Sequence, residues 1–294
     1  MTIAGARTLV SARDIGKGRG RAIYLIVLIA TMVLFSLAFI FPLYWMVIGA
    51  FKDSAELSQP TPTLVPEQWH PETYRTAWQT MQIAHFFLVT LGYAAGAWLF
   101  QIIFDVGVAY ALSKLRPMFG NVVLALILAT LMVPSAAMLV PNYLAVVDVP
   151  LLHINLINTP FAIWLPAVAN AFNIYLLKRF FDQIPNDLLD SAAIDGAGRA
   201  RALWHVVLPI SRPVLAVVSI FAIIGVWKDF LWPLLVEPDP SKNTISTALS
   251  RLGTEVPREE LMAGLVFASI PMIVIFLVFQ RSILNGLTAG GIKG

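Results

Sequence analysis

The chain has 294 residues, of which 58% are hydrophobic and 13% are charged, and it contains no cysteine. Soluble globular proteins carry about 25% charged residues, so this composition favours a protein surrounded largely by lipid. The lack of cysteine excludes disulfides, thiolate metal sites and a cysteine nucleophile. The net charge of +3 is small, so the positions of the basic residues carry more information than their sum.

Six stretches of the sequence are free of Lys, Arg, Asp and Glu, and a spanning helix needs about 20 mostly apolar residues. Five of the stretches reach that length, and the other, 213–227, continues as an apolar segment after the pair Lys228 and Asp229. The first apolar run is too long for a cleavable signal peptide, so we expect it to be retained. The sequence therefore predicts an all-α polytopic membrane protein whose six spans lie near 24–48, 86–110, 121–142, 158–177, 213–235 and 262–281.

Basic residues are distributed unevenly between the two faces that six spans would create. Fourteen Lys and Arg fall on the face with both termini and five on the opposite face. The positive-inside rule therefore predicts that both termini are cytoplasmic. The expected organisation is an N-terminal tail at 1–21, a permease domain at 22–281 and a C-terminal tail at 282–294, with a large cytoplasmic loop at 178–212.

The loop 178–212, called the elbow below, carries signals for two short helices. Pro185 suits a helix start, where its missing N–H has no cost, and Gly196 and Gly198 suit the left-handed end of that helix. A second helix is expected from Arg199 until Pro209 stops it. Small and apolar residues give the first helix an apolar stripe, formed by Leu188, Leu189, Ala192 and Ala193.

The elbow also carries an extended motif. It reads Asp190-Ser191-Ala192, then three residues, Gly196, nine residues, and Val206-Val207-Leu208-Pro209. This spacing resembles the Glu-Ala-Ala, three residues, Gly, nine residues, Ile-x-Leu-Pro signature of permease subunits of binding-protein-dependent ABC importers. Asp190, Ser191 and Val206 depart from the signature in residue type; the shorter acid at Asp190 could weaken an ion pair with a partner.

Three further segments resemble the carbohydrate permeases of that family, the maltose-type and glycerol-phosphate-type systems. They are Ala193-Ile-Asp-Gly-Ala197, Trp227-Lys-Asp-Phe-Leu-Trp-Pro233 and the tail Gly286-Leu-Thr-Ala-Gly-Gly-Ile-Lys-Gly294. Those permeases usually have Asn where Lys228 stands. The resemblance runs from about residue 24 to the end, in register with the predicted spans.

The resemblance implies a type I ABC importer permease fold in a bacterial inner or plasma membrane. The implied partners are a sister permease, a dimeric ATP-binding subunit and an extracytoplasmic solute-binding protein, and the implied cargo is a carbohydrate or sugar-like solute. The elbow would couple to the ATPase through Asp190, Ser191, Ala192, Ile194, Asp195, Gly196, Ala197, Leu208 and Pro209. The tail would contact the ATPase through Gly290, Gly291, Lys293 and Gly294.

Ionisable residues within apolar spans are costly and indicate a pathway or a paired site. The candidate pathway residues are Asp105, Trp227, Lys228 and Asp229. Pairing within the protein, or reach of the charged groups toward the outer water, is the favoured explanation for Asp105, Lys228 and Asp229, with direct contact to the solute as the alternative. Trp227 could stack on a sugar ring, but anchoring at the membrane interface is the favoured explanation.

No sequence signal predicts an enzyme. The glycine-rich segment 16–20 lacks the Gly-Lys-Ser/Thr ending of a phosphate-binding loop, and the four His have no metal-ligand spacing. We therefore expect no cofactor, no metal site and no nucleic-acid partner, with ATP hydrolysed by another chain. An ion-gradient-driven secondary transporter or channel is the alternative, although the elbow would then have no purpose; a membrane enzyme has no catalytic cluster to support it.

Overall fold

The computed structural model describes residues 18–289, with side chains placed for 20–280, and this part of the chain contains helices and no strand. The predicted all-α class is therefore confirmed. The long helices are α2 (Gly18–Gly49), α5 (Ile83–Tyr110), α13 (Arg212–Lys228) and α16 (Arg258–Ala289). The shorter helices are α3 (Ser54–Leu57), α4 (Glu72–Thr80), α6 (Gly120–Ala129), α7 (Ser135–Val147), α8 (Phe161–Trp164), α9 (Ala171–Asp182), α10 (Asn186–Ile194), α11 (Arg199–Ala202), α12 (Leu208–Ile210), α14 (Leu231–Val236) and α15 (Ile245–Leu252).

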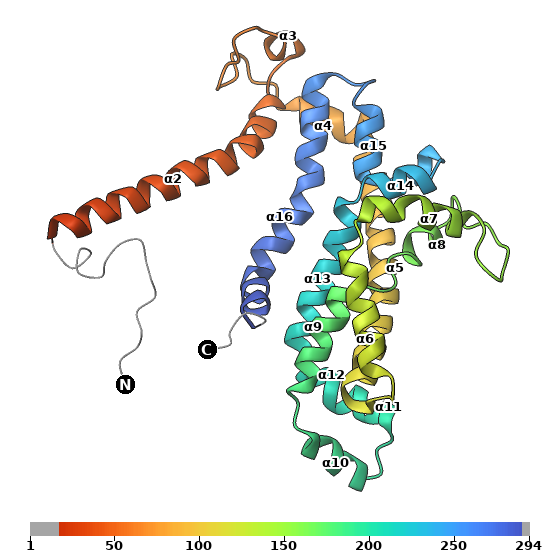
Figure 1. Cartoon of the computed structure of the whole chain (residues 1–294). Coiled ribbons are helices and arrows are strands. Elements are labelled where there is room, and N and C mark those ends of the chain that lie inside the picture. The colour runs from red at the N-terminus through yellow and green to blue at the C-terminus, as the bar shows by residue number, and fades with distance from the viewer. Residues whose placement is uncertain (1–17, 290–294) are drawn as a thin grey trace.

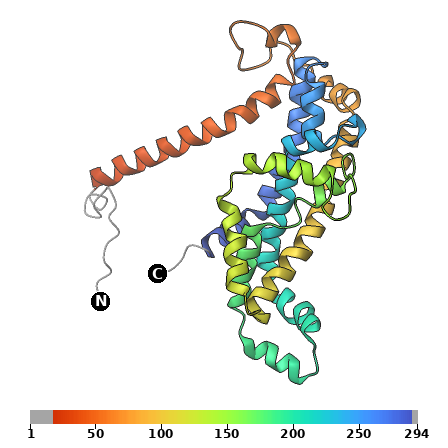
Figure 2. The same ribbon diagram turned by 45° about the vertical axis from the view of Figure 1, so that its right-hand side comes forward.

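α5 is the central helix, and α9, α13 and α15 pack along it (Figure 1). Small side chains on α5 permit this close approach, because Ala94, Ala97 and Ala109 are each no more than 1% exposed. Gly96 is the tightest point, since an added Cβ would lie 2.1 Å from the ring of Trp164. The α10 elbow and the α3–α4 region lie at opposite ends of this bundle (Figures 1 and 2).

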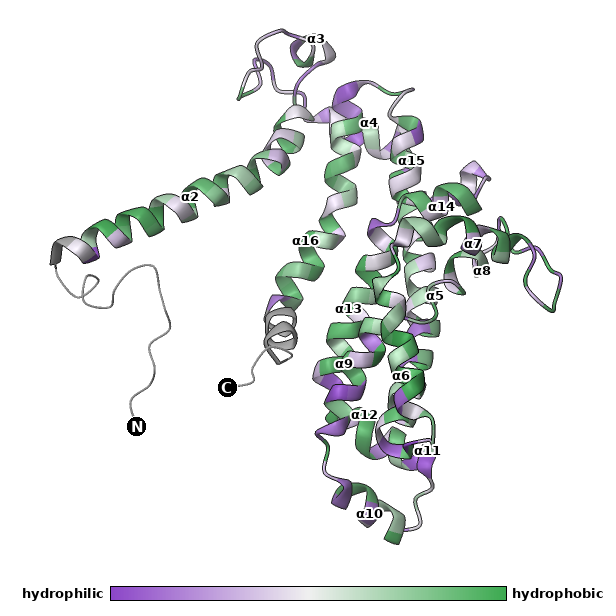
Figure 3. Cartoon of the chain, viewed as in Figure 1, coloured by the Kyte–Doolittle hydropathy of each residue, from purple (hydrophilic) through white to green (hydrophobic). Residues whose placement is uncertain are grey.

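α2 leaves the bundle as a separate arm that is apolar along most of its length (Figures 2 and 3). No residue in its most apolar 18-residue window is buried within the chain. Its C-terminal end meets α16, where a Cβ on Gly49 would lie 2.1 Å from the Met262 sulfur. A helix with apolar residues all round is stable where lipid or another apolar surface covers it.

Three helices are long and apolar enough to span a membrane, at 20–49, 83–115 and 258–280. Two bent pairs bring the number to five if each pair is one span: α6 with α7, bent by 109°, and Arg199–Ile210 with α13, bent by 85°. The first bend falls at Pro134, which has no N–H to continue the helix. Pro141 lies inside α7 without ending it.

The expectation of a continuous helix at 158–177 is wrong. Only α8 and the first part of α9 are helical there, and residues 165–170 between them are irregular. Pro166 supplies no N–H to continue α8, and the Asn170 side chain caps α9 by accepting from the Asn173 N–H at 3.0 Å. The described residues therefore contain fewer continuous spans than the hydropathy of the sequence predicts.

A buried ion pair fixes the connection that follows α2. Lys52 and Glu56 have side chains 1% and 5% exposed, and the Lys52 Nζ lies 3.1 Å from the Glu56 carboxylate. Lys52 also donates to Thr63 and lies 5.1 Å above the ring of Trp45. Burial opposes ionisation of Glu56, but hydrogen bonds from Thr63 and the Glu67 N–H, together with Lys52, hold its pKa below the usual value. The pair closes residues 52–67 into an ordered loop.

Candidate functional site

The first half of the elbow is α10, and its two ends are where the sequence predicts them. Pro185 is its N-cap and Gly196 follows it with φ of 80°. The Ala197 N–H donates to the Ala192 carbonyl at 2.8 Å and the Gly196 N–H to the Ala193 carbonyl at 3.0 Å. This pair of hydrogen bonds is a Schellman motif, which satisfies the last carbonyls and requires a left-handed residue that glycine supplies.

The second half of the elbow begins at Arg199 as predicted, but Pro209 does not end it. Residues 203–207 form a wide π-helical turn, in which the Leu208 N–H donates to the Leu203 carbonyl five residues back. The wider turn lets the chain continue through Pro209 as α12, because π-bulges absorb one extra residue in a helix. The helical path ends at Ser211, whose buried side chain donates to the Val207 carbonyl at 2.6 Å.

The surface of the elbow carries exposed apolar side chains. Ile194 is 86% exposed and Trp204 is 67% exposed. The expected stripe is divided: Leu188 is exposed, whereas Leu189 is half-buried and packs against the core around Phe181. Large apolar groups displayed together on a surface indicate an interaction site.

The two acids of the motif, Asp190 and Asp195, are exposed, and neither takes part in an ion pair among the described residues. Asp190 borders a hollow that is also lined by Lys114, Arg116 and Arg199 of this chain, whereas Asp195 does not line it. Asp195 is therefore the acid more open to a cationic partner. Ser191 is exposed and donates to the Asp187 carbonyl at 2.7 Å, whereas Ala192 and Ala197 are half-buried.

The end of α5 and the π-helical turn that follows it (Ala111–Leu115) hold the chain on either side of α10. Lys114 donates to the Ile184 carbonyl at 2.6 Å and to the Asn186 side chain at 3.1 Å, at the start of α10. On the other side, the Tyr110 hydroxyl donates to the Arg199 carbonyl at 3.1 Å. A hollow of about 350 Å³ separates α10 from these residues. Hydrogen bonds therefore tie the segments that flank α10 to the end of α5, on both sides of the hollow.

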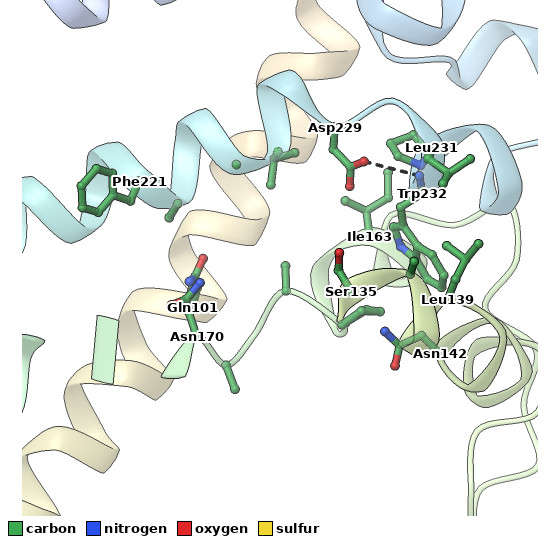
Figure 4. Close-up of a pocket in the computed structure, with 18 residues that line it drawn as sticks. Gln101, Ser135, Leu139, Asn142, Ile163, Asn170, Phe221, Asp229, Leu231 and Trp232 are labelled. Atoms are coloured by element: carbon green, nitrogen blue, oxygen red, sulfur yellow. Dashed lines mark hydrogen bonds between the residues drawn. The ribbon is translucent and has the colours of Figure 1, made fainter. Parts of the chain in front are cut away.

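A second feature is a half-open pocket of about 530 Å³ between α5, α7, α13 and α14, called the chamber below (Figure 4). Irregular backbone forms part of its wall, at 165–170 and at Asp229 between α13 and α14, and Ser135 beside the Pro134 break also lines it. Figure 4 shows Gln101 and Asn170 together on one side, and Ser135, Asp229 and Trp232 on another. Backbone that leaves helical geometry at membrane depth is tolerated where it lines such a cavity.

The four candidate pathway residues occupy different environments. Asp229 lines the chamber, whereas Asp105 is 1% exposed and accepts from the Asn170 N–H at 3.0 Å, behind the chamber wall. Trp227 is 4% exposed and donates from Nε1 to the Ala268 carbonyl at 3.2 Å, so in this chain it packs within the core. Lys228 is exposed and is not part of the chamber wall.

Sequence reasoning missed the polar side chains that line the chamber beside Asp229. They are Gln101, Ser135, Asn142 and Asn170. Each is an uncharged polar residue within a stretch predicted to cross the membrane, which is the signal that could have found them. The tail residues Gly290, Gly291, Lys293 and Gly294 lie outside the described residues.

Residues 106–288 match the family described as binding-protein-dependent transport system inner membrane component. The match covers more than half of the chain, so the chain belongs to this family and is a membrane component of a transport system. The elbow lies within the matched region, and so does the chamber apart from Gln101, which lies five residues before it.

Relatives extend this result over nearly the whole length. The chain is 29% identical to the diacetylchitobiose uptake system permease protein NgcG of Streptomyces coelicolor, across 89% of this chain and 86% of that protein. It is 28% identical to the sn-glycerol-3-phosphate transport system permease protein UgpE of Yersinia pestis, across 85% and 91%. The arabinooligosaccharides transport system permease protein AraQ of Bacillus subtilis is 27% identical, across 93% and 97%.

The fold also matches a solved structure. A chain of a bacterial ABC transporter involved in the import of the acidic polysaccharide alginate aligns with a TM-score of 0.78 and 24% identity, across 93% of this chain and 99% of that chain. The expected type I importer permease architecture is supported at the level of the fold.

Proposed function

We propose that the chain is a membrane-spanning permease subunit of an ATP-driven importer for a carbohydrate or sugar-like solute. The observation that carries the proposal is the elbow: an exposed apolar and acidic surface, ended by a left-handed glycine, on a member of a binding-protein-dependent transport family. Relatives named for diacetylchitobiose and arabinooligosaccharides support a carbohydrate as the cargo. An ion-gradient-driven carrier or channel would leave the elbow without a role.

The proposed topology has six crossings with both termini in the cytoplasm. The crossings are α2, α5, the pair α6 and α7, the interrupted segment α8 and α9, the pair α13 and α14, and α16. The excess of basic residues at the termini and in the elbow supports this orientation. The elbow then lies in the cytoplasm, where an ATPase is available, and residues 51–82 and 237–257 lie outside.

We propose that the elbow docks into a groove of a dimeric ATP-binding subunit. Ile194 and Leu188 would bury apolar surface there, and Asp190 or Asp195 would meet a basic side chain of the ATPase. Gly196 and Ala197 leave room for the partner's backbone, since a Cβ on Gly196 would meet nothing of this chain within 4 Å. Ser191, Ala192, Asp195, Leu208 and Pro209 shape the elbow, and the tail residues would add a second contact with the ATPase.

Motion of the ATPase would reach the spans through the hydrogen bonds of Lys114 and Tyr110, which join the segments flanking α10 to the end of α5. A sister permease would complete the pathway and cover the apolar arm α2 together with lipid. An extracytoplasmic solute-binding protein would deliver the cargo to the outer end. This chain would carry out no bond chemistry.

Substitution of Gly196 tests the proposal. Gly196→Trp is expected to abolish co-purification of the ATPase and uptake, while the protein still inserts into the membrane. Gly198→Trp is the matched control for size, because an added Cβ there also meets nothing within 4 Å and its φ of −67° is ordinary. The uptake assay uses the sugar that gives the largest thermal shift of the solute-binding protein. Wild-type co-purification and uptake by Gly196→Trp would show that the elbow is only a linker.

A further inference from the structure

The wall of the chamber carries charge of one sign. Asp229 is its charged side chain, and no Lys, Arg or His lines it among residues 18–289. A second carboxylate, Asp105, lies directly behind the wall, where it accepts from the Asn170 N–H. Lys228 is the neighbouring cation in sequence, but its side chain is exposed outside the lining.

We infer that this face of the pathway selects against anionic cargo, and that Asp229 is the residue that determines this selection. The inference rests on the proposed function and narrows its substrate class to uncharged carbohydrates, with cationic ones tolerated. Solutes that bear a phosphate or a uronate would meet an unfavourable potential at the chamber.

The physical basis is electrostatic focusing. A cavity lined by one sign of charge between apolar walls concentrates the field, and changes the local concentration of ions by about 10-fold to 1,000-fold. The other polar groups of the wall are neutral amides and a hydroxyl, from Gln101, Asn170, Asn142 and Ser135. These groups donate and accept hydrogen bonds with sugar hydroxyls, whereas a carboxylate or phosphate needs a cation that this wall does not supply.

Asp229 also makes a hydrogen bond within the fold, and the effect of losing this bond must be distinguished from the effect of losing the charge. Its Oδ1 accepts from the Trp232 N–H at 3.4 Å, at the start of the six-residue helix α14 (Figure 4). Asparagine keeps an oxygen acceptor at the same place and removes only the charge. Asp229→Asn therefore distinguishes a role in the field of the chamber from a role in holding α14.

The natural chain has no cysteine, so one introduced thiol in the chamber can report its potential. Gly225→Cys suits this purpose, because Gly225 lines the chamber four residues before Asp229 and an added Cβ meets nothing within 4 Å. In the assembled importer, we would measure how fast this thiol reacts with cationic trimethylammonium-ethyl and anionic sulfonato-ethyl methanethiosulfonate. Each rate is divided by the rate for free cysteine. Ser135→Cys is the second position if Gly225→Cys fails to insert.

The normalised cation-to-anion ratio is expected to be about tenfold or more. The ratio should fall several-fold when Asp229→Asn is combined with Gly225→Cys, and it should fall further when Asp229→Lys is combined with it. Asp148→Asn is the control for net charge, because Asp148 is exposed in the turn after α7 and does not line the chamber, so it should leave the ratio unchanged.

A ratio near one, or a ratio that Asp229→Asn leaves unchanged, would overturn the inference. A thermal-shift comparison of the solute-binding protein with neutral disaccharides, uronate-containing disaccharides and glycerol 3-phosphate provides a second test. Strongest stabilisation by an anion would also overturn it. Both results are independent of the Gly196→Trp experiment. Normal uptake together with a cation-to-anion rate ratio near one rejects the charge selection and leaves the proposed function intact. ATPase binding that survives Gly196→Trp rejects the proposed coupling and leaves the charge selection intact.

Discussion

Truncation of Ile194 should weaken binding of the ATPase without weakening the fold. The side chain is 86% exposed in this chain, so Ile194→Ala removes almost no internal packing and should change the free energy of unfolding by less than about 0.5 kcal/mol. If the ATPase groove buries the side chain, the substitution removes three buried carbon groups at about 0.8 kcal/mol each. The expected loss is about 2 kcal/mol, which is roughly a thirtyfold rise in Kd.

The assay is titration of labelled ATPase onto the purified permease complex in lipid nanodiscs, with Kd measured by fluorescence anisotropy. Leu151→Ala is the matched control, because Leu151 is an aliphatic side chain 94% exposed in the turn after α7, remote from the elbow. Ile194→Leu should recover most of the affinity, since it restores the buried volume. A Kd for Ile194→Ala within twofold of the natural chain would refute burial of this residue by the ATPase.

Three further perturbations test the topology and two buried acids. Single cysteines at Ser191 and Ser241 should label from opposite sides of the membrane; labelling of both in intact cells by an impermeant reagent would contradict the orientation. Asp105→Ala should lower stability by about 1–3 kcal/mol in thermal unfolding, more than Asp105→Asn, because it leaves the Asn170 N–H without its acceptor. Burial raises the pKa of Glu237 to about 7, so stability should fall as pH rises from about 4.5 to 7, and Glu237→Gln should remove that fall.

The sequence predicted the elements whose signals are local. Long uniform apolar runs predicted α2, α5 and α16, and these form continuous helices. Pro185 and Gly196 predicted the ends of α10, because a missing N–H and a left-handed residue act on the backbone at their own positions. Such features need no knowledge of the rest of the fold.

The direction of the α10 stripe could not be predicted in the same way. Leu188 and Leu189 are adjacent, so on a helix they point about 100° apart, and composition does not reveal which of them faces the partner. The structure turns Leu189 toward the core around Phe181 and leaves Leu188 exposed. The core cluster that Leu189 joins includes residues of α9 and of α5, and α5 is distant in sequence, so local patterns cannot decide this orientation.

The positions at which helix prediction failed share one physical explanation. Hydropathy treats an apolar stretch as one helix, yet the chain breaks helical geometry at Pro134, at 165–170 and at Asp229. In lipid, each broken segment leaves backbone groups that must find partners, so such breaks persist where they face a polar or water-filled space. The break at 165–170 and the break at Asp229 contribute residues to the chamber, and Ser135, which follows Pro134, also lines it. The interruptions of the third, fourth and fifth predicted spans therefore lie beside one polar pocket, and it is beside this pocket that local sequence rules fail.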